Sequence, residues 1–138
     1  MQTFLPYPSF PRSAHVLDNK RLGKQRSEVL IILRALNDPS YGWQNHPAVR
    51  MWRGYDQALV EYGVIICMEW RQRGFKDQTA EKIAAFGDET KSVIYPPWIG
   101  DVFFHRAHQS NLLRKDKAHY DQFFVRVPEN LPYLWPIP

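Results

Sequence analysis

The sequence has little of several features that define common protein classes. Its single cysteine, Cys67, cannot form an internal disulfide and lies in an apolar run, so we expect a buried, unreactive thiol. It has no glycine-rich phosphate loop, serine nucleophile elbow or cysteine–histidine signature, so kinase, redox and common hydrolase chemistry have no support. Its longest apolar runs are too short to cross a bilayer and no secretory signal is visible, so we expect a soluble, cytoplasmic protein without a membrane partner.

The sequence also lacks the alternating apolar and polar pattern of half-buried strands, and it contains no internal repeat. At 138 residues it is long enough for one hydrophobic core. We therefore predict an all-α fold, with residues 1–138 forming a single compact domain of about three main helices. An extended, proline-containing arm at 1–10 should precede the helices, and a proline-rich, apolar strap from residue 125 should follow them.

The prediction is organised around a helix over 18–36, with Asp18 as its N-cap and Asn37-Asp38-Pro39 as its stop. Helical spacing places Leu22, Val29 and Leu33 on one apolar stripe. Further helices are predicted at 11–17, 47–73, 80–86, 102–115 and from 117 onward, with the N-caps Ser9, Asn45 or His46, Thr79, Asp101 and Asp116. Gly54 and Gly63 weaken the prediction that 47–73 is continuous.

A second face of the 18–36 helix carries Arg21, Lys24 and Glu28, which follow at helical spacing. One interpretation is a solvated face on which Lys24 and Glu28 form an ordinary ion pair. The other, which we favour, is that Glu28 is an acid/base group at the edge of an anion-binding surface. The distribution of charge supports the second interpretation, because residues 1–40 carry six Lys+Arg against three Asp+Glu.

The whole chain has a net charge of +4, and aromatic residues make up 14% of it. Cations near aromatic side chains such as Trp43, Trp98 and Tyr120 are typical of surfaces that neutralise phosphates and stack on bases. His105 and His108 are three residues apart on one predicted helix face, so a metal site is conceivable with His119 or Asp101 as a third ligand. We favour contact with phosphate or solvent instead, and we predict no metal.

Three segments together resemble the pyrimidine-dimer DNA glycosylases of the phage-type endonuclease V class. DNKRLGKQRSE is similar to the start of that family's first long helix, with Glu28 at the position of the catalytic glutamate. WRGYDQALVEYGVIICMEWRQRGFKDQT is similar to its long second helix and the exit from it. SNLLRKDKAHYDQFF is similar to the C-terminal region in which aromatic and basic residues meet DNA.

The resemblance implies a compact all-α protein that uses no metal or other cofactor. It implies that the α-amine of the first residue attacks C1′ of the damaged nucleotide and forms a Schiff base, while Glu28 moves protons. An α-amine has an ordinary pKa of about 8, so part of it is an unprotonated nucleophile at neutral pH. Gln2 is bulky and favours retention of Met1, so the amine would belong to Met1 rather than to Gln2, or the lyase step would be lost. Ser27 stands where the family has an arginine beside the glutamate, so Arg26 or Arg21 would take over that role.

We therefore predict a DNA glycosylase with AP-lyase activity whose partner is double-stranded, damaged DNA, without an obligate protein partner. A catalytically inactive module that binds distorted DNA, or an enzyme for another modified base, would use the same surface. The catalytic candidates are Glu28, Met1 and Gln2. The DNA-binding candidates are arginines and lysines together with one histidine and one tyrosine: Arg12, Lys20, Arg21, Lys24, Arg26, His46, Arg50, Arg114, Lys115 and Tyr120.

Overall fold

The computed structural model describes residues 1–137, and all the regular secondary structure in this range is helical. This confirms the predicted all-α fold class. The described helices are α1 (Phe10–Val16), α2 (Asn19–Asn37), α3 (Pro47–Trp52), α4 (Asp56–Gln72), α5 (Ala80–Ala84), α6 (Val102–Lys115) and α7 (Lys117–Tyr120).

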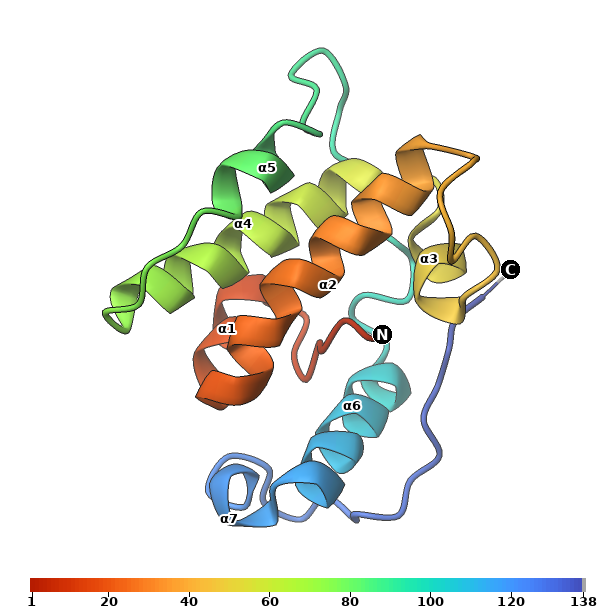
Figure 1. The fold of residues 1–138 in the computed structure, drawn as a ribbon. Helices are drawn as coiled ribbons and strands as arrows, with labels where there is room; N and C mark the ends of the chain where they lie inside the picture. The colour runs from red at the N-terminus through yellow and green to blue at the C-terminus, as the bar shows by residue number, and fades with distance from the viewer. Residues whose placement is uncertain (138) are drawn as a thin grey trace.

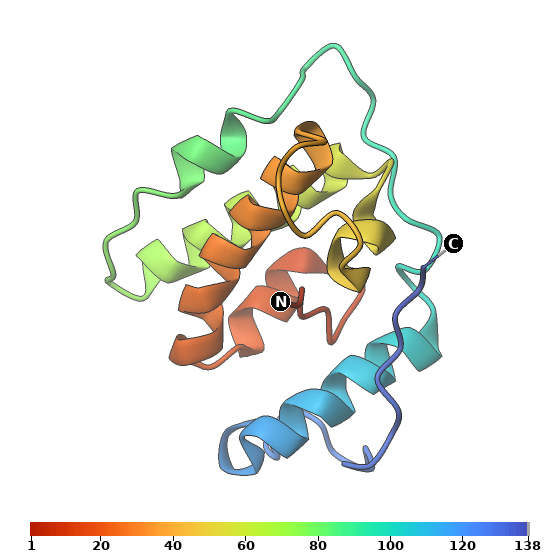
Figure 2. The ribbon, with the colours of Figure 1, turned by 45° about the vertical axis from the view of Figure 1, so that its right-hand side comes forward.

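The helices lie on two sides of the N-terminal arm. On one side α2 packs against α4, while α1 and α5 cover the same pair (Figure 1). On the other side lies a second group of helices, α6 and α7. The start of the chain lies between α2 and α6 (Figures 1 and 2). The predicted strap follows α7 and runs back past α6 towards α3.

The contact between α2 and α4 depends on the apolar stripe and on one glycine. Leu22, Val29 and Leu33 are fully buried, as their helical spacing predicted. Gly63 lies in the middle of α4, where a Cβ atom would come within 2.6 Å of a Val29 methyl group. The glycine therefore permits the close approach of the two helices and does not interrupt α4.

The predicted continuous helix over 47–73 is wrong, because the chain turns between α3 and α4. Gly54 adopts a φ of +89°, a left-handed conformation that glycine adopts without strain. Tyr55 N–H then donates a hydrogen bond to the Trp52 carbonyl at 2.8 Å, which closes the turn. The break lets α3 turn away from α4 towards the start of the chain.

Four of the predicted N-caps make capping hydrogen bonds, namely Ser9, His46, Asp101 and Asp116, whereas Asp18 and Thr79 make none. The side chains of Ser9, Asp101 and Asp116 each accept hydrogen bonds from backbone N–H groups in the first turn that follows them. Thr79 makes no such bond. The side chain of Asp77 instead accepts from the N–H groups of Thr79 and Ala80, at 3.2 and 3.0 Å.

The strap is held against α6 mainly through one arginine. The guanidinium of Arg114 donates hydrogen bonds to the carbonyl oxygens of Glu129 and Leu131, both at 2.9 Å. Leu131 N–H donates to the Ser110 hydroxyl at 3.0 Å. The extended course of the strap is confirmed from residue 131 to 137, whereas turns at 125–126 and 129–130 interrupt its first part, and residue 138 lies outside the described range. In the described part of the chain, no helix is both long enough and apolar enough to span a membrane.

Candidate active site

The N-terminal arm is fixed by side chains from several helices, although it has no regular secondary structure. Gln2 N–H donates to Glu28 Oε2 at 3.1 Å, and Phe4 N–H donates to Gln25 Oε1 at 3.0 Å, both on α2. Leu5 N–H donates to Nδ1 of a histidine on α6 at 3.0 Å, and its carbonyl contacts another at 2.8 Å. The arm therefore joins α2 to α6 and holds the start of the chain beside Glu28.

The two histidines that bind Leu5 are His105 and His108. Both are buried, so the prediction that they contact phosphate or solvent is wrong. Burial and, to a smaller extent, the neighbouring His105 together lower the pKa of His108 to about 3, which keeps the ring neutral. Their i, i+3 spacing serves to hold the arm, and residues 1–137 contain no cluster of three or more metal-ligating side chains.

Gln25 connects the arm to the glutamate. Its amide nitrogen donates to the Gln2 carbonyl at 2.8 Å and to Glu28 Oε2 at 3.1 Å. Its amide oxygen is also 2.7 Å from the buried hydroxyl of Tyr62 on α4. The side chain is fully buried, so these contacts replace all the hydrogen bonds to water that it has lost.

Glu28 is the central group of the site. It is only 9% exposed, and its Oε2 accepts hydrogen bonds from the arm and from Gln25. Lys24 lies 3.8 Å from its other carboxylate oxygen, a distance at the limit of an ion pair, and the Lys24 side chain is 72% exposed. The predicted pair between Lys24 and Glu28 is therefore present, but its carboxylate is nearly buried and does not lie on a solvated face.

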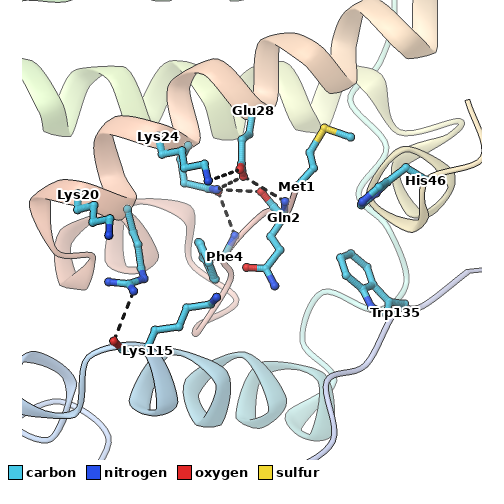
Figure 3. A pocket seen from close by; sticks show the side chains of 11 residues that line it. Met1, Gln2, Phe4, Lys20, Lys24, Glu28, His46, Lys115 and Trp135 are labelled. Carbon is cyan, nitrogen blue, oxygen red and sulfur yellow. Dashed lines mark hydrogen bonds and ion pairs between the residues drawn. The ribbon is translucent and has the colours of Figure 1, made fainter. Parts of the chain in front are cut away.

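A cavity of about 440 Å³ opens beside this carboxylate (Figure 3). Lys20, Lys24 and Lys115 project towards it from α2 and α6, and His46 and Trp135 face it from the opposite side (Figure 3). Burial lowers the pKa of Lys115, and the neighbouring cations, Arg21 first among them, lower it further. The complete lining is Met1, Gln2, Phe4, Lys20, Arg21, Lys24, Gln25, Glu28, His46, Lys115 and Trp135.

The structure thus brings together eight of the residues predicted for the site. All three catalytic candidates line this cavity, with five of the DNA-binding candidates: Lys20, Arg21, Lys24, His46 and Lys115. Arg21 also donates to the Asp18 carboxylate at 3.1 Å and to the Lys115 carbonyl at 3.5 Å, so both of its terminal nitrogens already have protein acceptors. Asp18 makes no side-chain cap bond to α2.

Two other candidates have structural partners away from the cavity. Arg26 donates to the Asp77 carboxylate at 2.6 Å, and its guanidinium lies 4.4 Å from the centre of the Trp70 ring. Tyr120 is fully buried, and its hydroxyl binds Asp18. Both side chains connect elements of the fold to one another.

The remaining three candidates lie outside the cavity lining. The Arg12 guanidinium is exposed and stacks 3.9 Å from the centre of the Tyr7 ring. Arg50 is exposed on α3. Arg114 holds the strap through the hydrogen bonds described above. None of these three arginines therefore lines the same cavity as Glu28.

Sequence reasoning missed Gln25 and Trp135. Gln25 carried a signal, because it lies between Leu22 and Val29 on the apolar stripe, where a polar side chain needs a buried partner. Trp135 carried no local signal. It reaches the cavity only because the strap returns from α7, and its ring packs edge-on against His46 at 5.9 Å.

The fold and the cavity define a class of helical protein in which the start of the chain, a nearly buried carboxylate and several cations share one site. The family model for pyrimidine dimer DNA glycosylase matches residues 1–82, which is more than half of the chain, and the protein belongs to that family. The matched range includes Met1, Glu28 and His46, but ends before Lys115 and Trp135. No curated protein and no solved structure gives a significant match.

Proposed function

We propose that this protein is a DNA-repair glycosylase that removes the base at pyrimidine dimers and then cleaves the strand as an AP lyase. One observation carries the proposal: the first residues of the chain are held against Glu28 in a cavity lined by cations. Membership of the pyrimidine dimer DNA glycosylase family supplies the substrate class. The cations supply the charge that a DNA backbone needs.

In the proposed reaction, the α-amine at the start of the chain attacks C1′ of the damaged nucleotide. The bond between C1′ and the base breaks, and its electron pair leaves with the base. Glu28 accepts a proton from the amine and passes it to O4′ as the nitrogen lone pair breaks the C1′–O4′ bond, which opens the sugar ring and forms the Schiff base. Removal of a proton from C2′ expels the 3′ phosphate and nicks the strand. Positioning the amine in advance raises its effective concentration far above that of a flexible side chain.

The register of the arm bears on which residue supplies the amine. The nitrogen that contacts Glu28 at 3.1 Å belongs to Gln2, and it is a peptide nitrogen whenever Met1 is present. Retained Met1 places its own amine one residue further along the cavity wall, whereas loss of Met1 converts the Gln2 nitrogen itself into the amine. In either case the reactive nitrogen belongs to the cavity lining. Intact mass measurement of the purified protein distinguishes the two.

The test combines one substitution with chemical trapping. Glu28→Gln should reduce the cleavage of dimer-containing DNA by about 10²- to 10⁴-fold, the usual contribution of an acid/base group. DNA affinity should stay close to that of the wild type, and unfolding should cost about 1 kcal/mol less because one charged acceptor is removed. Glu81→Gln is the matched control, since that exposed carboxylate on α5 does not line the cavity. It should cleave like the wild type.

Borohydride reduction during the reaction should trap the protein on DNA. The adduct should map to the first residue and should disappear after acetylation of the amine. Trapping at Lys20 or Lys24 would preserve the enzyme class but contradict the proposed nucleophile. Binding of damaged DNA without cleavage or trapping would identify a non-catalytic module, and cleavage only at another modified base would change the substrate.

A further inference from the structure

The cavity has two chemically different sides. Lys20, Lys24 and Lys115 lie on one side, and His46 and Trp135 lie on the other, with the start of the chain and Glu28 between them (Figure 3). A nucleotide has the same division, because its C1′ atom joins the base to the sugar and phosphates. Placing C1′ at the amine and the phosphates on the lysines directs the base towards His46 and Trp135.

The tautomer of His46 is set by its position in the fold. It is the N-cap of α3, and its Nδ1 accepts a hydrogen bond from Ala48 N–H at 3.0 Å. A neutral ring whose Nδ1 accepts carries its proton on Nε2. Burial lowers the pKa of His46, the positive chain terminus lowers it further, and Glu28 partly offsets both. His46 is therefore held as a neutral imidazole with an Nε2–H donor.

Aromatic neighbours hold the ring of His46 from two directions. Trp43 packs edge-on against it at 5.8 Å between ring centres, and Trp135 packs edge-on at 5.9 Å. Tyr133 in turn supports Trp135 at 4.7 Å and stacks on His108, which anchors the strap end to α6. The imidazole and the indole thus form one supported wall of the cavity.

We propose that His46 and Trp135 form the subsite for the leaving pyrimidine, with His46 as a further catalytic residue that donates its Nε2–H to a carbonyl oxygen of the base. This inference rests on the proposed glycosylase function. When the bond to C1′ breaks, the electron pair remains on the base and its carbonyl oxygens gain negative charge. A donor already in place stabilises that charge without transferring a proton, and the proton of the attacking amine still goes to Glu28. The Trp135 ring offers an apolar surface against the base.

Two substitutions separate the chemistry of His46 from its structural role. Asparagine is a preferred N-cap, so His46→Asn keeps an acceptor for Ala48 N–H but is too short to place a donor at the Nε2 position. Glutamine has the opposite properties, since its longer side chain can place an N–H group near Nε2 but caps poorly. His46→Asn should therefore keep the wild-type thermal midpoint, whereas His46→Gln should lower it.

Single-turnover cleavage should be measured on dimer-containing DNA and on DNA with an abasic site, which has no base to lose. His46→Asn should slow cleavage at the dimer by about 10²-fold, as loss of one transition-state donor typically does, and leave abasic-site cleavage unchanged. His46→Gln should recover part of the dimer rate. Trp135→Leu should raise the enzyme concentration that gives half of the maximal single-turnover rate on dimer DNA and leave abasic cleavage unchanged.

The outcomes distinguish this inference from the function on which it rests. A wild-type rate for His46→Asn at the dimer, or an equal loss on both substrates, would overturn the base subsite while leaving the glycosylase intact. Failure of the wild-type protein to cleave either substrate would overturn the proposed function, and the role of His46 with it. Slow dimer cleavage with normal abasic cleavage supports both.

Discussion

Two groups of cations in this molecule differ in what their charges contact. Arg26, Arg73 and Arg114 donate hydrogen bonds to acceptors within the protein. Arg73, for example, donates to the Leu17 carbonyl at 2.7 Å and to the Asn19 side chain at 2.9 Å. Lys20, Lys24 and Lys115 line the cavity, and among the described residues their amines make only the 3.8 Å contact between Lys24 and Glu28.

The comparison teaches that the residue type of a cation and the groups it contacts predict whether it stabilises the fold or binds DNA. The net charge of the protein does not separate these two roles. An arginine presents several N–H donors in a fixed plane and can donate to several carbonyl oxygens at once. It is therefore well suited to connect separate segments of this fold. A lysine is a flexible point charge that stays hydrated until a phosphate arrives. We expect substitution of the first group to affect stability and substitution of the second to affect DNA binding.

The largest effect on stability should come from the acceptor of Arg26. The Asp77 side chain is fully buried and accepts from Arg26, from the Thr79 and Ala80 N–H groups, and lies 3.3 Å from Arg71. Asp77→Ala leaves these donors without an acceptor and should cost about 3 kcal/mol in the free energy of unfolding. Urea unfolding measures it, with Glu89→Ala in an exposed loop as the control. If Asp77→Ala lowered the free energy of unfolding no more than Glu89→Ala does, the distinction between the fold-stabilising arginines and the cavity lysines would not hold.

A smaller but independent effect concerns the lysines. Replacing Lys20, Lys24 and Lys115 by glutamine together should reduce the slope of log affinity against log salt by about 0.9 for each phosphate that the variant no longer neutralises. The thermal midpoint should not change, because these amines hold no part of the fold. Lys76, Lys82 and Lys91 are exposed and lie outside the cavity lining, so their triple substitution is the matched control. Equal slopes for the two triple variants would contradict a DNA surface at the cavity.

Lowering the pH should remove part of the contribution that Asp77 makes to the free energy of unfolding. Burial raises the pKa of this carboxyl group, but the hydrogen bonds from Arg26, Ala80 and Thr79 outweigh burial and hold the folded-state pKa below the usual 3.8. The unfolded chain therefore takes up the proton first. The stabilisation is present above about pH 4 and is lost as pH falls through the lower folded-state pKa. The stability difference between wild type and Asp77→Asn should shrink from about pH 5 to pH 2. A constant difference would contradict the pKa assignment.

The smallest effect should come from an exposed ion pair. Lys117 lies 3.4 Å from a Glu129 carboxylate oxygen, and both side chains are at least half exposed. Lys117→Ala should change the free energy of unfolding by less than about 0.5 kcal/mol, since solvent and salt screen such pairs. Thermal unfolding at low and high salt measures it. If Lys117→Ala lowered the free energy of unfolding as much as Asp77→Ala does, then proximity alone, without burial, would determine how much an ion pair stabilises this protein.

The sequence predicted those parts of the fold that depend on neighbouring residues. The caps of α1, α6 and α7 and the apolar stripe of α2 follow from spacings of a few residues, and the structure has all of them. The break between α3 and α4 was missed because a single glycine at positive φ and a glycine packed within a helix look alike in a sequence. Gly54 and Gly63 differ in backbone conformation and in packing, and neither difference is visible in the sequence.

The site was predictable in part for the same reason. Arg21, Lys24 and Glu28 lie on one helix, so their shared surface followed from helical geometry. The hydrogen bond between Leu5 and His108 joins residues 103 positions apart, and no local pattern indicates it. The cationic candidates could not be divided into fold and cavity groups either, because their partners lie on other helices.

The fixation of the arm has a consequence for hydrogen exchange. The amide hydrogens of Gln2, Phe4, Leu5 and Tyr7 all bind side chains, on α2, α6 and α1. Backbone amides at a chain start ordinarily exchange with deuterium almost as fast as in an unfolded peptide. Those of Phe4 and Leu5 should instead exchange as slowly as the buried amides of α2, because their acceptors leave only when α2 or α6 separates from the rest. DNA would then meet a chain start that is already ordered, so binding need not supply the entropy of fixing it.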